Sequence, residues 1–159
     1  MEKFELVGPP MIGALLRMPL DAVYRRMLAD LHVAGYTDLV PAHFAVFRYP
    51  GPDNRRPSDL AEEVGMTRQA MNYLLGQLEQ FGYLTRGDDP DDQRARRVRL
   101  TKQGRAVVRT IRATVARIEA ELEQELGPEH LRKLRELLTK VNASEFVNGP
   151  HNTRHPSRP

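Results

Sequence analysis

The chain has 159 residues, enough for one domain with a sizeable hydrophobic core. Hydrophobic residues make up 40% and charged residues 28%, as in ordinary globular proteins, and a formal net charge of +3 does not by itself indicate a partner. There is no cysteine, which excludes disulfides, thiol redox chemistry and cysteine-ligated zinc. No apolar run approaches the roughly 20 residues of a membrane helix, and the N-terminus lacks a signal-peptide pattern, so we expect a cytoplasmic protein with no membrane partner.

Residues 9–35 predict helix, because their apolar side chains recur at mostly helical spacing and Gly35 is a suitable stop. Pro19 lies inside this stretch, so either the helix kinks there or a short first helix ends and a second begins. Pro41 then opens a short helix that we expect to run through Tyr49. The following YPGPDNRR has the composition of a loop.

Residues 57–82 have the pattern of two short helices joined by a tight turn. Ser58 is expected to cap the first helix, which Gly65 ends after two turns. Thr67 is expected to cap the second helix, which Gly82 stops. Its apolar residues at helical spacing are Met71, Leu74, Leu75, Leu78 and Phe81. Two such helices form a helix-turn-helix.

The next segment predicts a β-hairpin, with YLTR and RRVRLT as two short strands around DDPDDQ. Proline fixes φ and aspartate side chains bond to nearby backbone, and both properties favour a turn. Val98 and Leu100 are expected to anchor the outgoing strand in the core. The arginines before them would therefore project from a stiff hairpin.

A long helix is expected after Thr101, reaching about Leu126. Its apolar stripe consists of Val107, Ile111, Val115, Ile118, Leu122 and Leu126. Gly127-Pro128 breaks this helix, and a last helix follows with Leu131, Leu134, Leu138 and Val141 on one side. Residues 148–159 contain too little apolar surface to pack, which predicts a flexible basic tail.

One combined pattern runs through the helix-turn-helix and the hairpin. Its residues are Leu60, Val64, Gly65, Met66, Thr67, Met71, Leu74, Leu75, Leu78, Glu79, Gly82, Tyr83, Leu84 and Arg86, then Asp92, Arg94, Val98, Leu100, Thr101 and Gly104. This pattern resembles the MarR family of winged helix-turn-helix regulators. The resemblance extends upstream through LVPAHFAVF and downstream through the two C-terminal helices, so it covers nearly the whole chain. Pro19, the Gly51-Pro52 loop and the basic tail depart from the family's pattern.

The predicted fold is mainly α with a small β-hairpin wing (α+β), in one domain over residues 1–147. Residues 39–100 would form a winged helix-turn-helix DNA-binding lobe, and residues 9–36 and 101–146 a helical dimerisation lobe. The long apolar stripe has little else in the chain to cover it, and the resemblance implies that a second copy does so. The expected interface residues are Val115, Ile118, Leu122, Leu134 and Leu138. The alternative is a monomer whose helices form an intramolecular cap.

The helix from Thr67 is expected to read DNA, because arginine pairs well with guanine, and asparagine or glutamine with adenine, in the major groove. The outward residues there are Thr67, Arg68, Gln69, Asn72, Tyr73 and Gln77. The resemblance implies that Arg94 of the wing enters a minor groove, with Arg96 nearby and Asp92 holding an arginine in place. Ser58 and Lys102 are candidates for phosphate contacts. The alternatives are a plain solvent face and a hairpin whose charges neutralise one another.

Many members of the resembling family bind small aromatic acids, phenols or drugs between the lobes. In this sequence the crevice would be lined by Tyr24, Met27, Leu31, Tyr36, His43, Phe44 and Phe47, which are otherwise ordinary core residues. There is no Gly-x-Ser-x-Gly, phosphate loop or His-Glu-x-x-His, so we expect no enzyme activity and no cofactor. The histidines are too scattered in the sequence to predict a metal site.

The expected function is therefore sequence-specific regulation of transcription by a homodimer on a pseudo-palindromic double-stranded DNA operator. The resemblance implies a repressor that a small aromatic or phenolic effector releases. The alternative is a winged-helix protein-interaction module without specific DNA binding. Arg68, Gln69 and Asn72 beside a basic wing favour DNA over that alternative.

Overall fold

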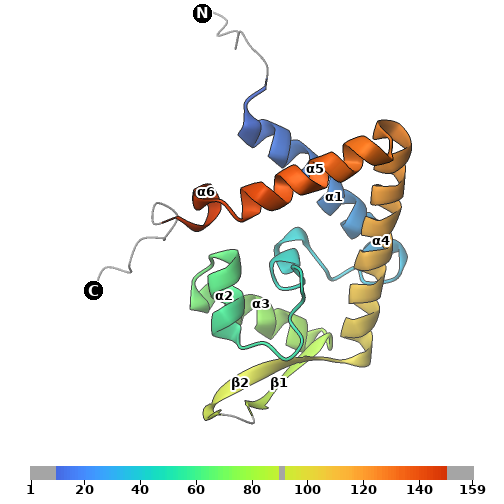
Figure 1. Ribbon diagram of the computed structural model, residues 1–159. Helices are drawn as coiled ribbons and strands as arrows, with labels where there is room; N and C mark the ends of the chain where they lie inside the picture. The colour runs from blue at the N-terminus through green and yellow to red at the C-terminus, as the bar shows by residue number, and fades with distance from the viewer. Residues whose placement is uncertain (1–9, 90–91, 150–159) are drawn as a thin grey trace, which may run out of the picture.

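The structure, a computed structural model, describes residues 10–89 and 92–149, leaving aside the side chains of residues 92–95. One lobe consists of helices α1 (Ile12–Val33), α4 (Lys102–Leu126), α5 (Pro128–Asn142) and the short α6 (Glu145–Asn148). The other consists of the 3-10 helix η1 (Pro41–Ala45), helices α2 (Pro57–Val64) and α3 (Arg68–Gln80), and strands β1 (Leu84–Asp89) and β2 (Asp92–Leu100). Figure 1 shows α2, α3 and the hairpin gathered beside the lower end of α4. The predicted α+β winged-helix fold is confirmed.

Helix α1 settles the question raised by Pro19, because it is a single helix that contains this proline. Proline removes one backbone hydrogen bond and frees the carbonyl of residue 15. The residues from 11 to 21 are all exposed, so water can satisfy that carbonyl. Exposure therefore permits a proline that a buried helix interior would reject.

The helix predicted from Pro41 to Tyr49 was too long, since η1 is a 3-10 helix that ends at Ala45. His43 and Phe44 of this helix are buried, and so are Val46 and Phe47, which follow it.

The helix-turn-helix begins two residues earlier than expected, because Pro57 occupies the first helical position and fixes a helical φ. Ser58 is therefore not the cap of α2, and its hydroxyl bonds to Asp59 instead. The end of α2 is as predicted, with Gly65 in the left-handed conformation at φ 63°. Thr67 caps α3 as predicted, its hydroxyl accepting the Ala70 N–H at 3.1 Å.

The hairpin has longer strands and a shorter connection than the sequence predicted. Strands β1 and β2 pair antiparallel from Leu84 opposite Leu100 to Asp89 opposite Asp92. Most of the predicted turn DDPDDQ therefore belongs to the strands, and only positions 90–91, which lie outside the described residues, separate them. The cause is Asp89, whose carboxylate is buried and bonded to Arg56, so this acid continues the strand instead of opening a turn.

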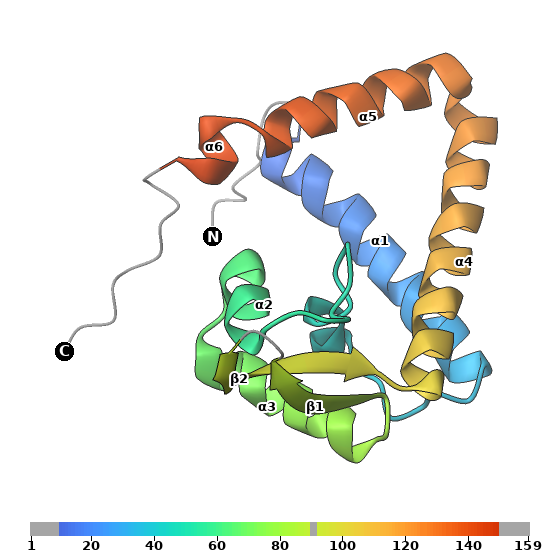
Figure 2. The ribbon, with the colours of Figure 1, turned by 60° about the horizontal axis from the view of Figure 1, so that its bottom comes forward.

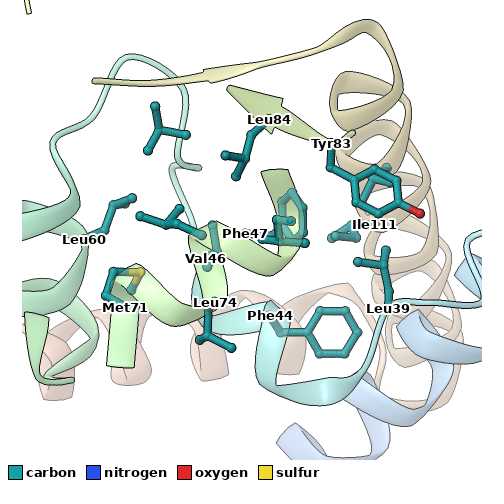
Figure 3. Packing of buried hydrophobic residues seen from close by; sticks show 14 of the residues in the cluster. Leu39, Phe44, Val46, Phe47, Leu60, Met71, Leu74, Tyr83, Leu84 and Ile111 are labelled. Carbon is teal, nitrogen blue, oxygen red and sulfur yellow. The ribbon is translucent and has the colours of Figure 1, made fainter. Parts of the chain in front are cut away.

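The core of the winged lobe is formed by residues from every element of that lobe together with α4. Figure 3 shows Leu60 of α2, Met71 and Leu74 of α3 and Leu84 of β1 converging on one layer, with Ile111 of α4 at its edge. Leu75, Leu78 and Val98 are fully buried in the same cluster. Burying such side chains stabilises a fold by about 1.5–3 kcal/mol each, and Met27 and Leu31 of α1 and Val107 of α4 belong to the same cluster, so one core joins the two lobes.

Helices α1 and α4 are joined by polar contacts as well as by packing. The guanidinium of Arg26 donates two hydrogen bonds to Glu121, at 2.5 and 2.6 Å. One turn further along, Asp30 accepts from the Thr114 hydroxyl at 2.5 Å and from Arg117 at 2.6 Å. Hydrogen bonding by Thr114, reinforced by Arg117, holds the pKa of Asp30 below its usual value.

The apolar stripe of α4 is largely covered within the chain, contrary to the expectation that it lacked cover. Ile118 is only 8% exposed and Val107 is fully buried, because α1 and the winged lobe pack on this helix. The uncovered apolar surface lies instead on the N-terminal half of α1, on α5 and on α6. Its residues are Met11, Ile12, Leu15, Leu16, Met18, Leu20, Leu134, Leu137, Leu138, Val141, Phe146 and Val147.

Figure 2 shows how this exposed surface arises, since α5 turns away from the end of α4 and does not fold back along it. Helix α1 diverges from α4 toward its own N-terminus in the same view. Helix α6 was not predicted from the sequence. Among the residues that the structure describes, no helix combines the length and apolar character needed to cross a membrane.

Candidate nucleic-acid interface and adjoining cavity

Helix α3 separates an apolar face from a polar one. Met71, Leu74, Leu75 and Leu78 pack inward. The predicted reading residues Thr67, Arg68, Gln69, Asn72 and Tyr73 are all exposed on the opposite side. The structure therefore brings these five predicted residues together on one accessible face.

Gln77 departs from the predicted outward position, because it is half-buried and bonded on both sides of its amide. Its Nε2 donates to the Tyr73 hydroxyl at 3.2 Å, and its Oε1 lies 3.2 Å from Nε2 of His43. Both partners orient the amide within the protein. Gln77 therefore lies between the exposed face of α3 and the interior.

His43 is 1% exposed and has hydrogen-bonding partners at both ring nitrogens. The backbone N–H of Val40 donates to Nδ1 at 3.1 Å, which makes Nδ1 an acceptor. In the neutral ring the proton must then lie on Nε2, which donates to Gln77. The ring also packs edge-on against Phe81, with centroids 5.9 Å apart. His43 is thus a satisfied buried histidine.

The wing is fastened to the start of α2 by a buried carboxylate that the sequence analysis did not single out. Asp89 has no exposed side-chain surface, and it lies 2.6 Å from Nε of Arg56 and 2.9 Å from Nε of Arg97. Arg56 precedes α2, whereas Asp89 and Arg97 belong to the two strands, so this cluster joins three segments. We name Asp89, Arg56 and Arg97 the wing clamp. An acid within a strand and arginines at two distant positions leave no local pattern that would identify it.

A second contact holds β1 against the end of α3. Glu79 accepts from Nε and Nη2 of Arg86 at 3.0 and 2.7 Å, and from the Arg86 backbone N–H at 3.1 Å. The side-chain hydrogen bond from Arg86 is the main cause that holds the pKa of Glu79 below its usual value. The hairpin is therefore fixed to α3 on one side and to the start of α2 on the other.

The arginines predicted to touch DNA from the wing are only partly visible. Arg96 is exposed on β2. The side chains of Arg94 and Asp92 lie outside the described residues, so their roles stay predictions. Lys102 is exposed at the first position of α4, and Ser58 is half-buried in the first turn of α2. Nothing bound marks either residue as a phosphate contact, so these roles stay predictions as well.

A cavity of about 470 Å³ lies between η1, α1 and α4. Four of the predicted crevice residues line it, namely Tyr24, Met27, Phe44 and Phe47. Tyr36 and His43 do not. Tyr36 packs against Tyr83, with ring centroids 5.9 Å apart, and His43 faces α3. Leu31 is also absent from the lining, since it is fully buried in the core.

The sequence analysis missed the charged and loop residues of this cavity. Arg48, Arg112 and Glu119 contribute its charged groups, and the loop Tyr49-Pro50-Gly51 contributes part of the wall. Charged residues at helical spacing on α4 are usually solvent-facing, so no sequence signal separated Arg112 from its neighbours. Within the described ranges, no group of three or more potential metal-ligating His, Cys, Asp or Glu residues gathers.

A helix-turn-helix followed by a clamped hairpin and framed by long helices defines a winged helix-turn-helix protein. The model of the MarR family matches residues 41–95, which span η1 through the first part of β2. A MarR family protein of Mycobacterium tuberculosis, solved in complex with salicylic acid, is 26% identical, with 86% of this chain and 99% of that chain covered and a TM-score of 0.61. MarR of E. coli in its apo form is 25% identical, with 84% and 98% covered and a TM-score of 0.63.

A third similar structure is the transcriptional repressor CouR bound to a 23-mer DNA duplex. It is 23% identical, with 82% of this chain and 92% of that chain covered and a TM-score of 0.63, and it bears on the fold alone. The chain is therefore similar to MarR family proteins, over residues 41–95 where the family model matches and in its winged-helix fold as a whole.

Proposed function

We propose that the chain is a sequence-specific DNA-binding transcriptional regulator that acts as a homodimer on a pseudo-palindromic operator. The observation that carries this proposal is the exposed face of α3, where Arg68, Gln69 and Asn72 lie together on a helix that contacts strand β1 of the hairpin. These side chains can pair with guanine and adenine edges in a major groove. The DNA duplex bound to CouR supports the same use of the fold.

Residues 39–100 form the DNA-binding lobe in this proposal, and the wing reaches the adjacent minor groove. Arg94 and Arg96 are the side chains we assign to that groove, because a narrow A/T-rich groove concentrates negative potential. Asp92 would steady an arginine there, and Ser58 and Lys102 would contact phosphates. The wing clamp supports this assignment, since it ties the hairpin, close to its turn, to Arg56 at the start of α2.

Residues 9–36 and 101–146 form the dimerisation lobe in this proposal. The exposed leucines of α5 and the N-terminal half of α1 form the surface that a second copy would cover. Two-fold symmetry would then place two α3 helices on half-sites roughly 34–36 Å apart, or a multiple of this distance. Of the predicted interface residues, Leu134 and Leu138 lie on this surface, whereas Ile118 is buried within the chain and Val115 and Leu122 are half-buried.

Small-molecule release of a repressor is the regulatory part of the proposal. The cavity lining is mostly apolar, with Tyr24, Phe44 and Phe47 among its aromatic residues, and it includes Arg48 and Arg112, so a small aromatic acid or phenol matches its chemistry. The salicylic acid complex of the M. tuberculosis relative supports this class of ligand. The cavity contacts α1 and α4 on one side and η1 on the other, so an occupant would touch both lobes.

The test is enrichment of duplexes from a random pool on the purified chain, followed by binding to the enriched and a scrambled duplex over a range of salt. A regulator should select an inverted repeat and prefer it over scrambled duplex by at least about a thousandfold. Gln69→Ala and Asn72→Ala should each weaken operator binding by about 1–3 kcal/mol and scrambled binding far less. Selection of no sequence would refute the proposal. Salicylate added to the operator complex tests the release step separately.

A further inference from the structure

A series of three hydrogen bonds runs from the backbone amide of Val40 to the exposed face of α3. The Val40 N–H donates to His43 Nδ1, His43 Nε2 pairs with Gln77 Oε1, and Gln77 Nε2 donates to the Tyr73 hydroxyl. The three distances are 3.1, 3.2 and 3.2 Å. The side chains in this series range from His43, which is 1% exposed, to Tyr73, which is 67% exposed.

The direction of every bond in this series follows from its first member. A backbone N–H can only donate, so Nδ1 of His43 must accept and Nε2 of the neutral ring must carry the proton. Gln77 then meets that proton with its carbonyl oxygen, which leaves its NH₂ group turned toward Tyr73. The hydroxyl of Tyr73 accepts from this group, so its own proton is free to point away from the protein.

The consequence concerns what Tyr73 offers to a DNA molecule lying against α3. A hydroxyl normally rotates to donate or accept as its partner requires. Here one lone pair of the Tyr73 oxygen accepts from Gln77, which turns the O–H outward and favours the donor role toward DNA. Its partners on the operator would be acceptors at base edges, namely N7 and O6 of guanine, N7 of adenine or O4 of thymine.

We propose that His43 is a buried positioning residue for DNA recognition, which acts through Gln77 to present the Tyr73 hydroxyl as a hydrogen-bond donor to an acceptor on the operator. This inference rests on the proposed function, since it assumes that α3 reads DNA. His43 itself never touches DNA in this arrangement. Its effect on binding must therefore pass through Tyr73.

A double-mutant cycle on the full chain tests this, with operator and scrambled duplex measured for each variant. Tyr73→Phe removes the donor and keeps the ring. His43→Phe removes both ring nitrogens and keeps an aromatic against Phe81. Each substitution should weaken operator binding roughly threefold to tenfold, the range for one hydrogen bond, with little change on scrambled duplex. The double variant should bind like the weaker single variant, because both changes remove one contact.

His43→Phe leaves the Val40 N–H without its acceptor, so thermal unfolding is measured alongside binding. Where this variant does not fold, Gln77→Met replaces it in the cycle, because methionine keeps the length of the side chain and removes both hydrogen bonds. Gln80→Met is the matched control, since Gln80 is an exposed glutamine of the same helix. Its operator affinity should equal that of the unmodified chain.

Losses that multiply in the double variant, or equal losses on operator and scrambled duplex, would overturn the positioning role. So would unchanged operator binding by a folded His43→Phe or Gln77→Met. Failure of the unmodified chain to prefer any duplex is a different result, because it refutes DNA recognition itself. The two failures are therefore distinguishable in one set of measurements.

Discussion

The two lobes differ in how completely each buries its own apolar residues. In the winged lobe, Leu75 and Val98 have no exposed surface. The wing clamp and the Glu79–Arg86 pair hold the hairpin to the helices. In the helical lobe, α5 contains no buried residue, and Leu138 and Phe146 are 37% and 73% exposed. The core of the winged lobe is therefore nearly closed within the chain, with Met27 and Leu31 of α1 and Val107 and Ile111 of α4 contributing to it, whereas α5 leaves its apolar side chains exposed. A surface for specific binding must hold its side chains in fixed positions, whereas an assembly surface must expose apolar side chains.

The charged contacts of the two lobes differ in the same way. The wing clamp encloses a carboxylate with no exposed surface. On α5, Arg132 pairs with Glu129 and Glu136 within one helix, but these side chains are 44–80% exposed. Exposed pairs of this kind contribute little to stability. The charged side chains of α5 therefore remain solvated, and its exposed apolar side chains are those that a partner could cover.

The largest expected effect is on the helical lobe. Leu138→Glu should weaken homodimer association by about 3–5 kcal/mol, because an unpaired charge would be buried where the leucine now lies. Sedimentation velocity over a dilution series measures the change. Lys140→Glu is the control, because residue 140 lies on the other side of α5, and it should leave association nearly unchanged.

The same experiment can break the comparison between the lobes. If the core of the winged lobe is nearly closed within the chain, the Leu138→Glu monomer should keep its helical content and still bind a single half-site weakly. A compact monomer for the unmodified chain at micromolar concentration would contradict the assembly role of α5. Loss of all structure on dissociation would contradict a core closed within one chain.

The next effect concerns the junction between the lobes. Gly104 lies in the first turn of α4 directly under the Tyr83 carbonyl, and a Cβ there would overlap that oxygen. Gly104→Ala should therefore cost roughly 2–3 kcal/mol of unfolding free energy, because backbone must move to relieve the overlap. Urea unfolding at fixed protein concentration measures this cost.

Gly76→Ala is the matched control for that substitution, since a Cβ at Gly76 would meet nothing within 4 Å. Alanine is favoured over glycine inside a helix, so Gly76→Ala should stabilise the protein by about 0.5–1 kcal/mol. Opposite signs for the same chemical change would confirm that close approach at the junction sets the cost. Equal signs would contradict it.

A smaller effect is expected within the winged lobe. Asp89→Asn removes the charge that Arg56 and Arg97 share, which should cost about 1–2 kcal/mol of stability, because the arginines remain partly exposed. Operator binding should fall further than the loss of stability alone explains, because the wing loses the contact with Arg56 that holds it to the start of α2. Asp88→Asn, on the neighbouring exposed acid of β1, is the control and should change neither quantity appreciably.

The sequence predicted most of the elements because local signals agreed there with the fold. Thr67 could be recognised as a cap and Gly65 as a stop, since each acts on backbone within four residues. The exposed residues of α3 followed from the helical spacing of its buried ones. Gln77 was the exception, because its partner His43 lies 34 residues away and no periodicity indicates such a contact.

The errors occurred where tertiary contacts overrode local propensity. Asp89 reads as a turn residue, yet Arg56 and Arg97 stabilise it inside a strand. The segment after Pro41 was expected to be helical through Tyr49, yet the 3-10 helix η1 ends at Ala45 and the buried Val46 and Phe47 follow it. The cavity was half predictable, because aromatic residues of η1 and α1 are conspicuous whereas Arg48 and Arg112 resemble any surface arginines.

The smallest expected effect compares the acid sensitivity of the two lobes. Hydrogen bonding by Arg86 lowers the folded-state pKa of Glu79 below its ordinary value of 4.5. A lowered pKa contributes stability that is fully present above the unfolded-state value and is lost as the pH falls through the folded-state value. Glu79→Gln should therefore flatten the decline of stability below about pH 4.5 and cost less than about 1 kcal/mol at neutral pH, because the pair is about one-third exposed.

Asp30 gives the corresponding measurement in the helical lobe, since Thr114 and Arg117 lower its folded-state pKa from an ordinary value of 3.8. Asp30→Asn should flatten the same decline at a slightly lower pH, because its unfolded-state pKa is lower than that of Glu79. The two groups lie in separate lobes and share no partner, so their effects on urea unfolding should add in the double variant. If acid first dissociates the dimer and only then unfolds the winged lobe, Asp30→Asn should shift sedimentation and Glu79→Gln should not. Identical effects of both substitutions on sedimentation would mean that the two lobes respond to acid as one unit. That result would contradict the difference between them that their apolar burial indicates.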